Sequence, residues 1–87
     1  MYTLYFSKRA LKDRAYLKAA GLESNARELL ELLTIDPFKN PPPYESLTGN
    51  LSGLYSRRIN YQHRLVYAVS RDEKIVRIFR MWTHYDI

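Results

Sequence analysis

The stretch from residue 50 to residue 69 constrains the fold most; it reads NLSGLYSRRINYQHRLVYAV. Two runs with strand composition are joined by four residues, a length typical of a β-hairpin, and they span 54–59 and 64–69. The first run ends in the basic pair Arg57-Arg58 and the second begins with Arg64. Since side chains alternate between the two faces of a strand, Arg57 and Arg58 point to opposite faces. Guanidinium groups on a small sheet, beside aromatic rings, indicate a surface that binds phosphate.

Upstream of the hairpin, the sequence predicts a first strand at residues 2–6, followed by a helix. Ser7 is a suitable N-cap for a helix from residue 8 to about residue 20, and Gly21 is suitable to end it. The apolar positions expected to face the interior are Leu11, Ala15 and Leu22.

A second helix is predicted from residue 25 to about residue 35, with Ser24 as its N-cap. Its apolar residues follow the i, i+3, i+4, i+7 spacing of one helix face, and they are Ala26, Leu29, Leu30 and Leu33. Because only a short turn containing glycine separates the two helices, an antiparallel helical hairpin is expected.

A proline-rich segment, DPFKNPPP at residues 36–43, follows the second helix. Proline fixes φ at about −65°, so this segment is expected to hold Tyr44 and Glu45 in a defined position. A last strand is predicted at residues 75–82. The predicted order is β-α-α-β-β-β, an α+β domain of two layers. In it the helical hairpin covers one face of a mainly antiparallel four-stranded sheet and leaves the other face open.

Length and charge limit the functions that this chain can have. Eighty-seven residues predict a single domain, residues 1–87. Cysteine, a signal peptide and a membrane-spanning apolar run are all absent from the sequence, so a cytoplasmic protein with no membrane partner is expected. Of the formal net charge of +5, residues 37–87 carry +4, from eight basic and four acidic side chains. Nucleic acid is the polyanion that this charge indicates, and a merely solvated basic surface explains the charge equally well.

The sequence supports metal-free RNA cleavage better than metal chemistry. Neither His63 nor His84 has a carboxylate at ligand spacing, and no glycine-rich phosphate loop is present, so no metal or other cofactor is expected. Cleavage through the 2′-OH needs a base, an acid for the leaving 5′-oxygen, and cations for the phosphorane-like transition state. Glu45 is the candidate base and His84 the candidate acid, while Arg58 and Arg64 are the candidate cations.

Each of these residues also has a simpler interpretation. On composition alone, Glu45 is more readily explained as an exposed loop carboxylate, and His84 as a tail histidine that packs on Trp82. Nonspecific attraction of phosphate or a cross-strand salt bridge would account for Arg58 and Arg64. Composition therefore predicts only a basic α+β domain that faces nucleic acid.

Three segments together resemble the Txe/YoeB branch of the RelE-like toxins, and they are DPFKNPPPYESL, NLSGLYSRRINYQHRLVYAV and the terminal MWTHY. The resemblance covers essentially the whole chain and is strongest from residue 36 to residue 85. It implies the toxin of a type II toxin–antitoxin system. Such a toxin is a metal-independent, ribosome-dependent endoribonuclease that cuts mRNA in the ribosomal A site and inhibits translation.

The resemblance also implies partners and residue roles. The partners are the ribosome, mRNA and a cognate antitoxin of the Phd/YefM type, and operator DNA is bound only by the toxin–antitoxin complex. The sequence does not choose between a monomer and a homodimer. The catalytic group that the resemblance implies comprises Glu45, Arg64 and His84. The substrate contacts are Arg58 and Tyr85, to which the basic pair adds Arg57.

The chain departs from this family pattern in three places. Thr48 stands where many relatives carry a lysine, Asp86-Ile87 extend the tail, and a lysine-rich first helix replaces an acidic one. Two other classes of function therefore stay open. One is a non-catalytic RelE-like module that acts by occupying the ribosome or nucleic acid. The other is a gyrase-inhibiting relative, against which the pair of Glu45 and His84 argues.

Overall fold

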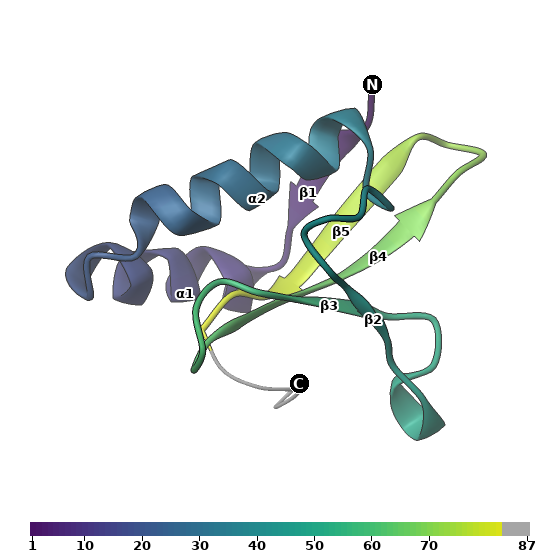
Figure 1. Cartoon of the computed structure of the whole chain (residues 1–87). Helices are drawn as coiled ribbons and strands as arrows, with labels where there is room; N and C mark the ends of the chain where they lie inside the picture. Colours follow the sequence, from purple (N-terminus) through teal and green to yellow (C-terminus); the bar gives the residue numbers. More distant parts are fainter. Residues whose placement is uncertain (83–87) are drawn as a thin grey trace.

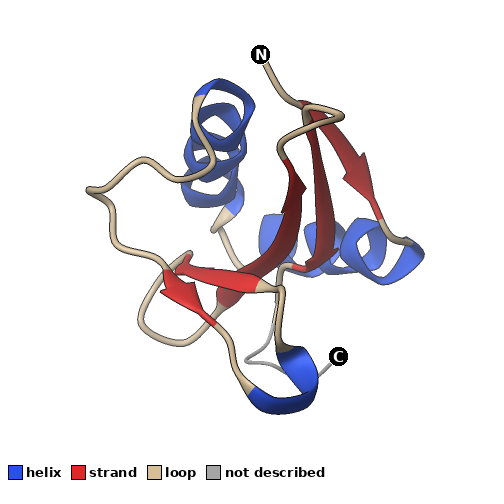
Figure 2. Cartoon of the chain, turned by 90° about the vertical axis from the view of Figure 1, so that its right-hand side faces the viewer, coloured by secondary structure: helices blue, strands red, loops and turns tan. Residues whose placement is uncertain are grey.

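Two helices pack against a twisted five-stranded sheet in the computed structural model, which describes residues 1–82 (Figures 1 and 2). The elements follow in the order β1 (Thr3–Phe6), α1 (Lys8–Ala19), α2 (Glu23–Ile35), β2 (Glu45–Ser46), a short 3-10 helix (Gly49–Leu51), β3 (Tyr55–Arg58), β4 (Arg64–Ser70) and β5 (Ile75–Arg80). Neither helix of the described part has the length and apolar character needed to cross a membrane.

The sheet has the order β1-β5-β4-β3-β2. Three of its pairings are antiparallel, and β1 runs parallel to β5. The prediction of a mainly antiparallel α+β architecture is confirmed, but the predicted strand count of four is wrong. The fifth strand is β2, in which Glu45 lies opposite Ser56 and Ser46 opposite Tyr55. Two residues are too few to show the alternating pattern that identifies a strand in a sequence.

Helix α1 begins where the sequence predicts, because the Ser7 hydroxyl accepts a hydrogen bond from the Ala10 amide at 3.0 Å. Its inward face is different from the predicted one. The buried residues are Ala10, Asp13 and Leu17, whereas Leu11 is 51% exposed. The helix is turned so that a carboxylate, rather than its apolar neighbour, faces the sheet.

This carboxylate forms a buried ion pair with the last strand. Oδ2 of Asp13 accepts from Nε of Arg80 at 2.9 Å and from the backbone amide of Met81 at 3.0 Å. Because an unpaired buried charge is strongly unfavourable, the need to pair Asp13 with Arg80 determines how α1 is turned.

Helix α2 has the predicted inward face, since Ala26, Leu29 and Leu33 are buried and Leu30 packs against the core. The predicted cap is wrong, because the helix begins at Glu23 after Leu22 and has no side-chain cap. Gly21 ends α1 with a φ of +75°, a conformation that favours glycine. The core between the helices and the sheet is completed by Leu65, Tyr67, Val76, Ile78 and Met81.

Candidate active site

Two arginines face each other at the loop end of the β3–β4 hairpin. Arg58 and Arg64 are directly opposite in the antiparallel register. Arg58 is exposed, and its Nη1 donates to the Tyr61 carbonyl at 3.1 Å. Like charges opposite one another destabilise a sheet, so this position is one where a bound anion would be favourable.

Glu45 lies on the same face of the sheet as these two arginines. The register places Glu45 opposite Ser56, and Ser56 is two residues from Arg58 on β3. Nη1 of Arg64 donates to Oε1 of Glu45 at 2.9 Å, and the two side chains are 14% and 59% exposed. The carboxylate and both predicted cations thus come together, and we call this group, Glu45, Arg58 and Arg64, the edge site. The cross-strand salt bridge that the sequence left open for Arg64 is also present.

The edge site adjoins an open depression at the rim of the sheet. Five residues line it: Glu45, Ser46, Leu47, Thr48 and Leu51. Thr48, the residue that stands in place of the family's lysine, is therefore part of this depression and adds no cation to it. The edge site thus places guanidinium groups and a carboxylate beside an open depression, and guanidinium groups are suited to bind phosphate.

Arg57 does not belong to the edge site, and its predicted role as a substrate contact does not fit its position. It is only 1% exposed, and its guanidinium donates to Tyr67 and to three backbone carbonyls. The buried guanidinium of Arg57 therefore presents no N–H group at the surface to a phosphate. The signal was present in the sequence, because alternation along β3 directs Arg57 away from the face that carries Arg58.

Tyr67 is a buried residue beside Arg57 that the sequence analysis did not single out. Its hydroxyl accepts from Nε of Arg57 at 3.0 Å and donates to the Pro37 carbonyl at 3.0 Å. Burial raises the pKa of the Tyr67 phenol above its usual range, against the lowering effect of the neighbouring Arg57 charge. The phenol therefore stays protonated and able to donate this hydrogen bond.

His63 contacts Trp82, the last residue that the structure describes. Its ring stacks on Trp82 with centroids 4.0 Å apart, and Nδ1 is hydrogen bonded to the Trp82 carbonyl. Tyr16 approaches the same indole at 5.6 Å. His63 therefore has a structural role, in which it packs against the indole of Trp82. The other two predicted site residues, His84 and Tyr85, lie outside the described residues, and their roles stay predictions.

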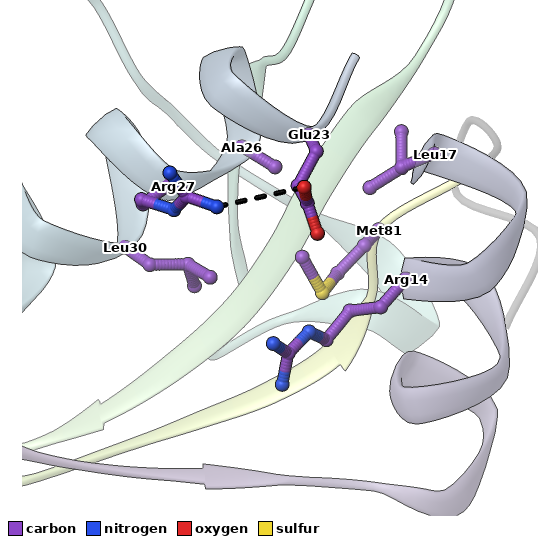
Figure 3. A pocket seen from close by; sticks show the side chains of 7 residues that line it. All are labelled: Arg14, Leu17, Glu23, Ala26, Arg27, Leu30 and Met81. Atoms are coloured by element: carbon purple, nitrogen blue, oxygen red, sulfur yellow. Dashed lines mark ion pairs between the residues drawn. The ribbon is translucent and has the colours of Figure 1, made fainter. Parts of the chain in front are cut away.

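A second concavity lies between the helices and the end of the sheet (Figure 3). Its lining is Arg14, Leu17, Glu23, Ala26, Arg27, Leu30 and Met81. Glu23 and Arg27 form an exposed ion pair across it at 3.5 Å. None of these residues belongs to the edge site, and the predicted chemistry uses none of them. In residues 1–82, no group of three or more histidine, cysteine, aspartate and glutamate side chains is arranged to hold a metal ion.

Comparisons with known proteins agree with the fold. Residues 6–85 match the family described as the YoeB-like toxin of bacterial type II toxin-antitoxin systems. The chain is 43% identical to toxin YoeB of Escherichia coli K12 over 84 residues, which is 94% of this chain and 98% of that protein.

Solved structures show the same architecture. A YoeB/ParE toxin from Agrobacterium tumefaciens has a TM-score of 0.85 and 26% identity, over 98% of this chain and all of the other. YoeB in a heterotetrameric YoeB–YefM complex from Staphylococcus aureus has a TM-score of 0.80 and 32% identity, over 98% of this chain and 99% of the other. A YoeB dimer from the same organism has a TM-score of 0.75 and 34% identity, over 97% and 98%.

The fold and these matches thus define a small toxin of the RelE-like superfamily. Within it, the chain belongs to the YoeB-like toxins of bacterial type II toxin–antitoxin systems.

Proposed function

We propose that this toxin is a ribosome-dependent endoribonuclease that cuts mRNA in the ribosomal A site and so arrests translation. The observation that carries the proposal is the edge site, in which Glu45 and Arg64 are joined at 2.9 Å beside the exposed Arg58. A carboxylate held among cations on an open sheet face is what cleavage through the 2′-OH requires of the protein.

In the proposed reaction, Glu45 accepts the proton of a ribose 2′-OH, and the 2′-oxygen attacks the adjacent phosphorus. The bond to the 5′-oxygen of the next nucleotide breaks, and that oxygen takes a proton from His84. The products are a 2′,3′-cyclic phosphate and a free 5′-OH. Arg58 and Arg64 stabilise the charge that gathers on the phosphoryl oxygens, and Tyr85 contacts the substrate. No metal or other cofactor takes part.

The proposed partners follow from the family. The ribosome and the mRNA in its A site form the substrate complex. An antitoxin of the Phd/YefM type neutralises the toxin, as the S. aureus YoeB–YefM complex suggests, and only the pair binds operator DNA. A homodimer of the free toxin is supported by the S. aureus YoeB dimer.

The test compares Glu45→Gln with the wild type on a reporter mRNA, with cleavage mapped by primer extension. The amide keeps the shape of the side chain but cannot act as the base, so we expect the loss of at least about 10²-fold in cleavage rate. The matched control is Glu31→Gln, which changes an exposed carboxylate on α2. The wild type and the control should cut within codons, and only on translated message.

Two results would contradict the proposal. If Glu45→Gln still arrests growth and Arg58→Ala does not, the toxin acts by binding rather than by cleavage. If neither variant affects growth arrest and the toxin inhibits DNA supercoiling in vitro, it belongs functionally with the gyrase inhibitors.

A further inference from the structure

The segment that carries Glu45 has few hydrogen-bond donors of its own. All four prolines of the chain lie in residues 37–43, which we call the proline arm; it crosses from the end of α2 to β2 (Figure 1). Proline has no N–H, so four of the seven residues of the arm cannot donate to a backbone ladder that would hold the arm against the sheet. Its one backbone–backbone hydrogen bond in the described part of the chain joins the Lys39 amide to the Asp36 carbonyl at 3.2 Å.

The missing donors come from one buried side chain. Nη1 of Arg57 donates to the Pro42 carbonyl at 2.6 Å. Nη2 donates to the carbonyls of Pro37 at 3.0 Å and Lys39 at 2.8 Å. A single guanidinium therefore ties both ends and the middle of the proline arm to strand β3. Arginine suits this position because its donors are spread over a rigid planar fork, whereas lysine places all three of its donors on one atom.

Aromatic side chains enclose the guanidinium. Tyr67 links Nε of Arg57 to Pro37, the first residue of the arm. The Arg57 guanidinium also lies over the Tyr44 ring, 4.9 Å from its centroid. Tyr44 in turn packs edge-on against Tyr55 and Phe38, with centroids 5.9 Å and 6.0 Å away. Tyr44 is the residue directly before Glu45, so these contacts reach the residue next to the carboxylate of the edge site.

Strand β2 alone holds Glu45 weakly. It contains only two residues and pairs with β3 on one side at the rim of the sheet. Proline fixes φ within the arm but supplies no hydrogen bond that joins the arm to the sheet. The position of the carboxylate therefore depends on what anchors the arm.

We propose that Arg57 is a positioning residue for Glu45, acting with Tyr67 as a clamp that fixes the proline arm and thereby the carboxylate beside Arg64. The inference rests on the proposed function, because it assigns Arg57 to the reaction through Glu45. Arg57 itself never reaches the substrate.

The experiment measures cleavage on programmed ribosomes together with amide hydrogen exchange, for Arg57→Lys and Tyr67→Phe. Arg57→Lys keeps the charge and loses the fork, so kcat should fall about tenfold or more, since small misplacements of catalytic groups have large effects. KM for the ribosome complex should stay unchanged. Exchange should rise at residues 38–47 and stay unchanged in α1, β4 and β5. Tyr67→Phe removes one hydrogen bond from each partner and should give the same pattern with smaller changes.

The matched control is Leu17→Ala, which destabilises the core from α1 without touching the arm. It should keep the kcat of the wild type at a temperature where it is folded. The positioning role is overturned if both folded clamp variants cut at the wild-type rate, or if their exchange rises equally throughout the sheet. Tyr67→Phe decides the question if Arg57→Lys does not fold. Glu45→Gln run alongside separates the two proposals: if it cuts normally while the clamp variants still loosen residues 38–47, the catalytic role of Glu45 fails and the clamp stands.

Discussion

Two ion pairs in this toxin have the same chemistry and opposite surroundings. Asp13–Arg80 and Glu45–Arg64 each join a carboxylate to an arginine with an N–O distance of 2.9 Å. The side chains of the first pair are 5% and 8% exposed, and those of the second are 59% and 14% exposed. The first pair links α1 to the end of β5, and the second links β2 to the start of β4.

This difference in exposure indicates that Asp13–Arg80 stabilises the fold, whereas Glu45–Arg64 is accessible to a substrate. A buried carboxylate that also accepts the Met81 amide cannot leave its partners without leaving charges unpaired in the interior. A pair whose carboxylate is exposed, like that of Glu45, contributes little to stability, because water and salt screen it. The carboxylate of the exposed pair can therefore exchange its partner for a ribose hydroxyl without loss of the fold.

The largest expected effect comes from breaking the buried pair. Asp13→Asn removes the charge that Asp13 places beside the buried Arg80 guanidinium, and we expect the free energy of unfolding to fall by about 3–5 kcal/mol. Urea denaturation measures this. Asp72→Asn, in the exposed turn before β5, is the matched control and should change stability by about 0.5 kcal/mol or less. Equal small losses for both variants would show that the Asp13–Arg80 pair does not hold the helical layer in place.

Breaking the Glu45–Arg64 pair should affect cleavage strongly and stability only slightly. Arg64→Ala removes a cation from the transition state, so cleavage should slow by about 10²–10³-fold. Stability should change by about 1 kcal/mol or less. Arg27→Ala is the control, because it removes an exposed arginine from the Glu23 ion pair on α2 and should leave cleavage unchanged. A loss of stability in Arg64→Ala as large as that in Asp13→Asn would remove the distinction between the two pairs.

Much of the architecture could be predicted from the sequence because the responsible signals are local. The hairpin, the Ser7 cap and the inward face of α2 depend on short-range patterns of apolar and capping residues. The inward face of α1 could not be predicted this way. Its position depends on Asp13 meeting Arg80, which is 67 residues away in the chain, and no local pattern records such a contact.

The candidate site shows the same division. The chemistry of RNA cleavage and the family resemblance both predict Glu45, Arg58 and Arg64, and the structure brings these three residues together. The adjacent Arg57 was grouped with Arg58 because charge alone does not separate them. Only the acceptors supplied by the proline arm and by Tyr67 show that its guanidinium makes four hydrogen bonds inside the protein.

The smallest expected effect concerns the floor of the edge site. Ser56 lies directly opposite Glu45, and its hydroxyl is buried without a hydrogen-bond partner in the structure of residues 1–82. A buried polar group without a partner is unfavourable, so Ser56→Ala should leave the free energy of unfolding unchanged or raise it by about 1 kcal/mol. Cleavage should stay at the wild-type rate, because the Arg64 ion pair and the clamped proline arm orient Glu45 without a hydrogen bond from Ser56. A marked drop in kcat with unchanged stability would contradict this, and would add the Ser56 hydroxyl to the groups on which the exposed pair depends.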